Sequence, residues 1–232
     1  MEFTRESIKI DPAAETERIV KFLQTTARQR LHRYGGVVGI SGGVDSSVVL
    51  ALSLRAFGVG RVVALMMPEK DSDPETERFS RLVAAHYGIE PILEDITPVL
   101  DGFGCYPRRD EAIYRIFPEY DAASGYKAKI GLPQNLLEED TLNVFYLTIV
   151  TPAGEEKTQR LPLKEYFQIV AASNFKQRTR MAMLYYHAEL RNYAVIGTAN
   201  KNEHDQGFFV NGAMEGWMSS LSSIYLKPRC TN

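Results

Sequence analysis

A pair of glycines between a short apolar run and a longer one is the feature that most constrains the fold of this chain. Residues 37–40 (VVGI) have the length and composition of a strand that is buried on both faces. The segment SGGVDSS follows at residues 41–47, and residues 48–58 (VVLALSLRAFG) then have the pattern of a buried helix. A strand, a glycine-rich turn and a helix in this order begin a βαβ unit. The sequence therefore predicts an α/β fold.

The same alternation continues along the chain. Further strands are predicted at residues 61–68, 91–96 and 193–198, and helices after the caps Asp11-Pro12 and Asp73-Pro74 and over residues 174–190. Strands that alternate with helices indicate a parallel sheet with helices on both faces. We expect an open, doubly wound sheet in three α/β/α layers with right-handed crossovers, as in Rossmann-like folds.

The alternation is lost between residues 97 and 164, where aromatic residues are dense. Within this stretch, residues 142–163 contain two strand-like runs on either side of Pro152-Ala153-Gly154, which predicts a β-hairpin. We expect residues 97–164 to be an insertion on one α/β domain that spans residues 1–210. Residues 211–232 form a separate tail in this interpretation.

Composition excludes several classes of protein. The 232 residues carry a net charge of −2, so a broadly basic nucleic-acid-binding surface is not expected. Cys105 and Cys230 lie far apart and form no CxxC pair, which favours a reducing compartment over a disulfide scaffold or a zinc site. No apolar run approaches the roughly 18 residues of a membrane helix. We expect a cytoplasmic protein that binds neither nucleic acid nor membrane.

The glycine segment has the chemistry of a phosphate site. Gly42 and Gly43 let the backbone approach an anion closely, and Ser41, Ser46 and Ser47 offer hydroxyl donors. Asp45 would repel phosphates unless a divalent cation lies between them, and Mg²⁺ prefers a carboxylate together with phosphate oxygens. The alternative interpretation is a Gly-Gly turn capped by Ser and Asp for purely structural reasons.

The segment resembles the PP-loop of the ATP-pyrophosphatase superfamily, whose members cleave ATP between the α- and β-phosphates and adenylate a substrate. The resemblance implies that this loop binds the pyrophosphate part of ATP. The ATP-binding residues it implies are Gly39, Ile40, Ser41, Gly42, Gly43, Val44, Asp45 and Ser46. The loop alone does not select one member of the superfamily.

A second segment narrows the choice. Residues 174–181 (NFKQRTRM) resemble the NAD synthetase motif N-x-x-x-R-x-R-M, and by this match Arg178 would contact deamido-NAD. Arg178 and Arg180 lie two residues apart at a predicted helix start, where their directions differ by about 200°. One arginine can then reach a ligand while the other binds protein or a partner subunit. Solvated arginines on a helix surface are the alternative interpretation.

A third segment lies at the carboxyl end of a predicted strand, where open α/β sheets bind ligands. Residues 197–203 (GTANKNE) resemble the synthetase segment G-T-x-x-x-x-E. By this match Thr198 would contact ATP, and Glu203 would bind Mg²⁺ together with Asp45. The alternative is a polar loop with a solvated glutamate.

Three motifs in this order make the chain similar to the NAD synthetase family, specifically its ammonia-using catalytic domain. The resemblance implies that ATP adenylates deamido-NAD and that ammonia then releases AMP and NAD⁺. No catalytic side chain is expected beyond those that position substrate and metal. Cys105 is interpreted as a bystander and His187 as a packed or surface residue, whereas His204 stays unassigned. The resemblance further implies a homodimer, with ammonia free or supplied by a separate glutaminase.

Two alternative functions are also compatible with the sequence. One is a protein that binds ATP without turnover. The other is a different PP-loop enzyme, such as a tRNA-modifying one, which the lack of a basic extension and of a catalytic cysteine pair disfavours.

The sequence resemblance ends after Val210, where the family continues with substrate-binding lysine and aspartate residues. With permitted codons and one added base, residues 211–228 can be re-read as KRRDGGVDVKPIIHLFKT, which is similar to the family's continuation. We therefore predict a one-base deletion after Val210, with a naturally diverged terminus as the alternative. Reading the gene tests this prediction, and a shifted frame without a family-like peptide would contradict it.

Overall fold

The computed structural model describes residues 10–131, 145–199 and Val210, and the chain divides into two compact units. The first unit comprises residues 1–97 and 178–232, and the second comprises Pro98–Gln177. Three sequence predictions lie outside the described residues: the metal role of Glu203, the unassigned His204 and the altered tail after Val210. None of the described helices is long and apolar enough to cross a membrane.

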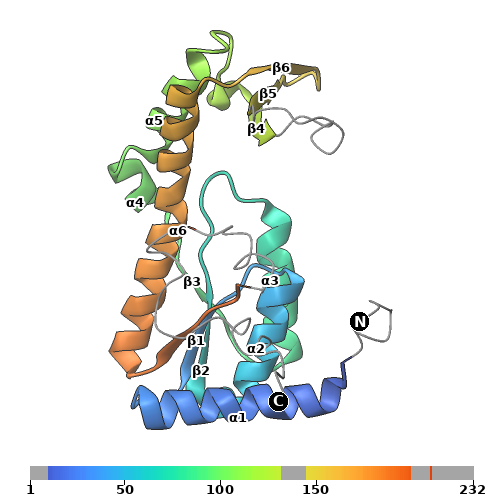
Figure 1. Cartoon of the computed structure of the whole chain (residues 1–232), viewed down its shortest axis with the longest axis vertical. Coiled ribbons are helices and arrows are strands. Elements are labelled where there is room, and N and C mark those ends of the chain that lie inside the picture. The colour runs from blue at the N-terminus through green and yellow to red at the C-terminus, as the bar shows by residue number, and fades with distance from the viewer. Residues whose placement is uncertain (1–9, 132–144, 200–209, 211–232) are drawn as a thin grey trace, which may run out of the picture. The chain divides into compact units, whose positions relative to one another are not determined.

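The first unit contains a parallel sheet of four strands in the order β3-β2-β1-β7 (Figure 1). Its strands are β1 (Gly36–Gly39), β2 (Val62–Met66), β3 (Ile92–Leu93) and β7 (Ala194–Ile196). The register pairs Val38 with Ala64 of β2 and with Ile196 of β7. All pairings are parallel, which confirms the predicted α/β sheet.

Helices cover both faces of this sheet, as the doubly wound prediction requires. The helices α1 (Pro12–Thr25), α2 (Val44–Phe57) and α3 (Pro74–His86) contribute side chains to a core with Val38 and Ile196. On the opposite face, the neighbouring strand residues Val37 and Val195 pack with α6 (Leu163–Arg191). Because alternate strand residues point to opposite faces, the continuous apolar run of β1 supplies both cores.

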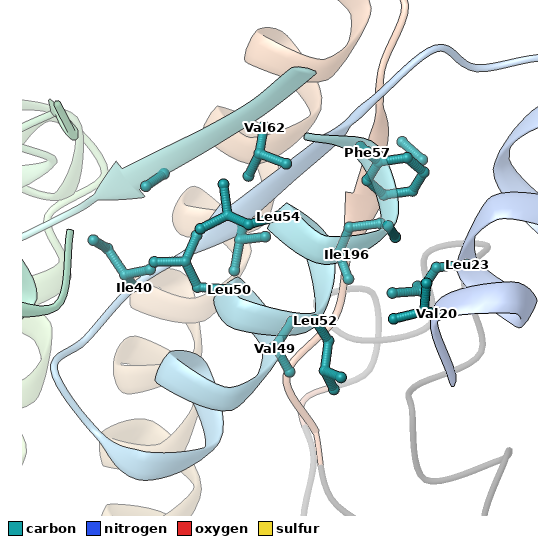
Figure 2. Close-up of a cluster of buried hydrophobic side chains, with 14 of the residues drawn as sticks. Val20, Leu23, Ile40, Val49, Leu50, Leu52, Leu54, Phe57, Val62 and Ile196 are labelled. Carbon is teal, nitrogen blue, oxygen red and sulfur yellow. The ribbon is translucent and has the colours of Figure 1, made fainter. Parts of the chain in front are cut away.

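Helix α2 is held by its apolar sequence between the sheet and α1. Figure 2 shows Val49, Leu50 and Phe57 in a cluster with Leu23 of α1 and Ile196 of β7. Leu50 is fully buried. Burial of one such side chain contributes roughly 1.5–3 kcal/mol. This cluster therefore fixes α2, whose first turn directly follows the loop that contains Gly42 and Gly43 (the glycine loop).

The second unit holds a smaller antiparallel sheet in the order β4-β5-β6. Its strands are β4 (Lys127–Gly131), β5 (Tyr146–Val150) and β6 (Glu156–Arg160), with helices α4 (Thr97–Gly102) and α5 (Cys105–Tyr114) and the 3-10 turn η4 (Ala122–Ser124) earlier in the chain. The β5–β6 hairpin was predicted, whereas β4 was not. The alternating polar residues of KAKIG give β4 only one partly buried side chain, Ile130, and no apolar run.

Helix α6 is longer than predicted and begins at Leu163 rather than Asn174. The sequence places only Leu163, which with Leu161 flanks Pro162 in an alternating pattern, at the end of the predicted hairpin, and it predicts no element for residues 164–173. Proline is tolerated just before a helix begins, so the same pattern also fits a helix start.

Short connecting elements complete the described chain: the π-helical turn η2 (Thr26–Arg30) and the 3-10 turn η3 (Val59–Arg61).

The glycine loop has a backbone shape that its first glycine makes possible. Gly42 has φ +70°, in the left-handed region that residues with a Cβ rarely adopt. A Cβ at this position would lie 2.5 Å from the Cβ of Phe79 on α3. Gly43 instead has φ −77°, and a Cβ there would meet only the Ser41 hydroxyl, at 3.4 Å.

We predict that Gly42→Ala lowers the free energy of unfolding by at least about 2 kcal/mol, because positive φ and the contact with Phe79 both oppose a side chain. Gly43→Ala is the matched control and should change it by no more than about 0.5 kcal/mol. Urea unfolding of both variants measures the difference. Equal stability of the two variants would contradict this account of the loop.

Candidate functional site

The carboxyl ends of three neighbouring strands meet at one edge of the larger sheet. Gly39 pairs with Leu65, so the glycine loop after β1 and residue Met67 after β2 leave the sheet side by side. Val38 pairs with Ile196, which brings Gly197 and Thr198 to the same edge. Ligands of open α/β sheets bind at this edge, and the predicted ATP-binding residues that follow β1 and β7 are therefore neighbours.

The loop after β1 is closed by hydrogen bonds to one carbonyl. The Gly43 carbonyl accepts from the Ser46 hydroxyl at 3.0 Å, from the Ser47 hydroxyl at 2.8 Å and from the Ser47 amide at 3.1 Å. The Ser46 hydroxyl also accepts from the Ser41 amide, at 3.3 Å. Ser46 is buried whereas Ser41 and Gly43 are exposed. The serines thus hold the loop in place before any anion binds.

This arrangement leaves backbone donors at the start of α2 open. The first amides of a helix have no intrahelical partner, and within the described chain no side chain caps α2 at Gly43. The helix dipole adds a partial positive charge at this end. The helix begins at Val44 rather than at Val48, so Asp45 and Ser46 belong to its first turn. An anion at the loop would meet amides that point outward from a fixed turn.

Asp45 fits a magnesium ligand better than a structural cap. Its side chain is exposed, and among the described residues no hydrogen bond or ion pair engages its carboxylate. Asp11 and Asp73 differ, because each accepts hydrogen bonds from amides at the start of its helix. Mg²⁺ uses one or two carboxylates together with phosphate oxygens, so a single open carboxylate beside the predicted phosphate loop would suit it. The described residues contain no cluster of three or more metal-ligating side chains.

The two arginines of the second motif, residues 174–181, have different surroundings. Arg180 donates from Nε to the Met67 carbonyl at 3.2 Å, so it ties α6 to the carboxyl end of β2. Arg178, on another side of the helix, is exposed. This matches the prediction that one of the two binds protein. The predicted position at a helix start is wrong, because both lie in the second half of α6.

The role of Met67 was missed from the sequence. Met67 lies near the end of the strand predicted through Pro68, and a backbone acceptor leaves no trace in residue type. A useful signal would have been the position of Met67 at the carboxyl end of a predicted strand, where carbonyls lose their ladder partners.

Cys105 and His187, for which the sequence indicates no role in the reaction, are both buried. Cys105 is fully buried, and its thiol donates to the Ala172 carbonyl at 3.1 Å. His187 is 4% exposed, with Nε2 2.8 Å from a Glu94 carboxylate oxygen and Nδ1 3.1 Å from Arg191. Because Arg191 can only donate, Nδ1 accepts and Nε2 carries the proton toward Glu94. His187 is therefore a packed residue that joins α6 to the end of β3.

Comparison with known sequences gives a consistent family. A family model described as NAD synthase matches residues 15–113 and 134–227. An NH(3)-dependent NAD(+) synthetase of Rhizobium meliloti is 46% identical over 224 residues, which cover 96% of this chain and 66% of the relative. The Mesorhizobium japonicum protein of the same name is 48% identical over 203 residues, or 88% of this chain and 63% of the relative. The chain thus spans just under two thirds of the length of these relatives.

Solved structures support the fold. An NH3-dependent NAD synthetase from Campylobacter jejuni aligns with a TM-score of 0.56 at 23% identity, and the alignment covers 88% of this chain and 63% of the Campylobacter jejuni chain. An NMN synthetase from Francisella tularensis has a TM-score of 0.57 at 20% identity, with 88% and 61% covered. At these identities the likeness concerns the fold alone.

The family match also extends beyond Val210 to residue 227, so the proposed domain boundary at Val210 stays a prediction.

The matched residues include the glycine loop, Arg178 and Thr198, which are the described residues that the sequence assigned to the site. Parallel pairing brings the loop and Thr198 to one sheet edge, and the family model covers both. The chain belongs to the NAD synthase family.

Proposed function

We propose that this chain catalyses the ATP-dependent amidation of deamido-NAD to NAD⁺ with ammonia as the nitrogen donor. One observation carries the proposal. At the carboxyl end of β1, the hydroxyls of Ser46 and Ser47 fix the loop, while the first amides of α2 and the exposed carboxylate of Asp45 stay available for a ligand. Membership of the family and the NH(3)-dependent relatives support the choice of substrate and donor. The resemblance also implies a homodimer, and free ammonia or a separate glutaminase as the source.

The loop residues would bind and orient ATP. Open amides at the start of α2 would bind the β- and γ-phosphates, which leave as pyrophosphate, and Thr198, two residues after β7, would contact the same nucleotide. Ser46 keeps the loop shape through its bond to the Gly43 carbonyl, so the donors need little reorganisation when ATP binds. Asp45 and Glu203 would hold Mg²⁺, which when bound neutralises phosphate charge.

The reaction would proceed in two displacements. An oxygen of the nicotinate carboxylate attacks the α-phosphorus of ATP, the α–β phosphoanhydride bond breaks, and pyrophosphate leaves. Ammonia then attacks the carbonyl carbon of the acyl-adenylate, loses a proton, and AMP leaves with the former carboxylate oxygen. Arg178 would hold the dinucleotide so that its carboxylate faces ATP. The contribution of the protein is positioning and charge neutralisation, without a covalent enzyme intermediate.

The purified chain, incubated with ATP, Mg²⁺, deamido-NAD and ammonium, should form NAD⁺ and AMP in equal amounts. Asp45→Asn should lower kcat by at least about a hundredfold, because it removes a charge that counts mainly in the transition state. Asp73→Asn is the matched control: this exposed carboxylate caps α3, asparagine caps equally well, and activity should persist. ATP binding without NAD⁺ formation by the wild-type chain would contradict the proposal.

A further inference from the structure

Thr179 has a buried hydroxyl that makes no hydrogen bond. The residue is 5% exposed, and among the described residues its Oγ1 is the buried side-chain polar atom left without a partner. A hydroxyl inside a helix has an easy local partner, the carbonyl four residues earlier. Ser53 donates to the Val49 carbonyl at 2.7 Å, and Ser80 donates to the Thr76 carbonyl at 2.8 Å. Thr179 does not use this option.

An unsatisfied buried hydroxyl is unfavourable, so native proteins keep few of them and these call for an explanation. The location of Thr179 supplies one. Its neighbour Arg180 is bound to the Met67 carbonyl at the carboxyl end of β2. Since consecutive helix residues rise by only about 1.5 Å, Thr179 lies at the same level of α6, close to the ligand-binding edge of the sheet.

We propose that Thr179 is a binding residue for the dinucleotide substrate, with Oγ1 as a hydrogen-bond donor to a phosphate or ribose oxygen of deamido-NAD. This inference rests on the proposed function. The dinucleotide is favoured over ATP because Thr179 directly follows Arg178, which the sequence resemblance implies would contact deamido-NAD, whereas the loop after β1 offers its own donors for ATP. Threonine in a helix has two accessible χ1 rotamers, so its hydroxyl can turn toward a ligand without backbone movement.

The substitution Thr179→Val separates this role from a packing role, because valine has the same shape without the hydroxyl. The melting temperature of the free protein should rise by about 2–4 °C, since an unpaired buried polar group is removed. The Kd for deamido-NAD should increase about tenfold, and the Kd for ATP should stay within about twofold. Thr179→Ser retains the hydroxyl and should bind deamido-NAD like the wild type.

Thr148→Val is the matched control in the same protein. Thr148 is 8% exposed, but its hydroxyl is paired with that of Thr158 at 2.8 Å. This variant should lower the melting temperature and leave both Kd values unchanged. A higher melting temperature together with weaker binding of deamido-NAD in Thr179→Val, and neither change in Thr148→Val, distinguishes a ligand contact from a structural hydroxyl.

Calorimetric titration of the full chain with deamido-NAD and with ATP, alongside the turnover assay, tests the inference. A Kd for deamido-NAD that is about tenfold higher in Thr179→Val than in the wild type, and unchanged in Thr179→Ser, supports the inference whether or not turnover occurs. Wild-type turnover with an unchanged Kd in Thr179→Val overturns the role of Thr179 and leaves the proposed function standing. Neither binding nor turnover of deamido-NAD by the wild type overturns both.

Discussion

The parallel pairing of β1 with β2 on one side and β7 on the other is the constraint on which the site depends. This register places the loop after Gly39, the carbonyl of Met67 and residue Thr198 at one sheet edge, although they are far apart in sequence. The pairing is stable because β1 is apolar on both faces, with Val38 in one core and Val37 in the other. Packing of β1 therefore determines where the candidate site lies.

At that edge, glycines give the loop its backbone shape and serine hydrogen bonds keep that shape fixed. Glycine at position 42 permits the positive φ and the close approach of α3. The cost in conformational freedom is offset by the serines, which converge on the Gly43 carbonyl and leave the amides of the first helical turn open. Preorganised donors of this kind stabilise charge in a transition state without reorganisation.

The α/β sheet, the glycine loop and the start of α3 at Asp73-Pro74 were predictable from the sequence, because periodicity and caps are local signals. The start of α6 and the strand β4 were not. Alternation around Pro162 fits either a strand or a helix start, and β4 is stabilised by pairing with β5 rather than by its own composition. Contacts to the backbone, such as Arg180 to Met67, and the unpaired hydroxyl of Thr179 depend on tertiary structure and have no sequence pattern.

Adenylation of a carboxylate at the loop is the proposed step from which the rest of the reaction follows. Exchange of labelled pyrophosphate into ATP, measured without ammonia, tests this step most directly, because reversal of the first displacement needs only ATP, Mg²⁺ and the dinucleotide. We expect exchange that requires deamido-NAD and that stops when Mg²⁺ is removed. Exchange that does not depend on deamido-NAD, or no exchange from a chain that binds both substrates, would contradict it.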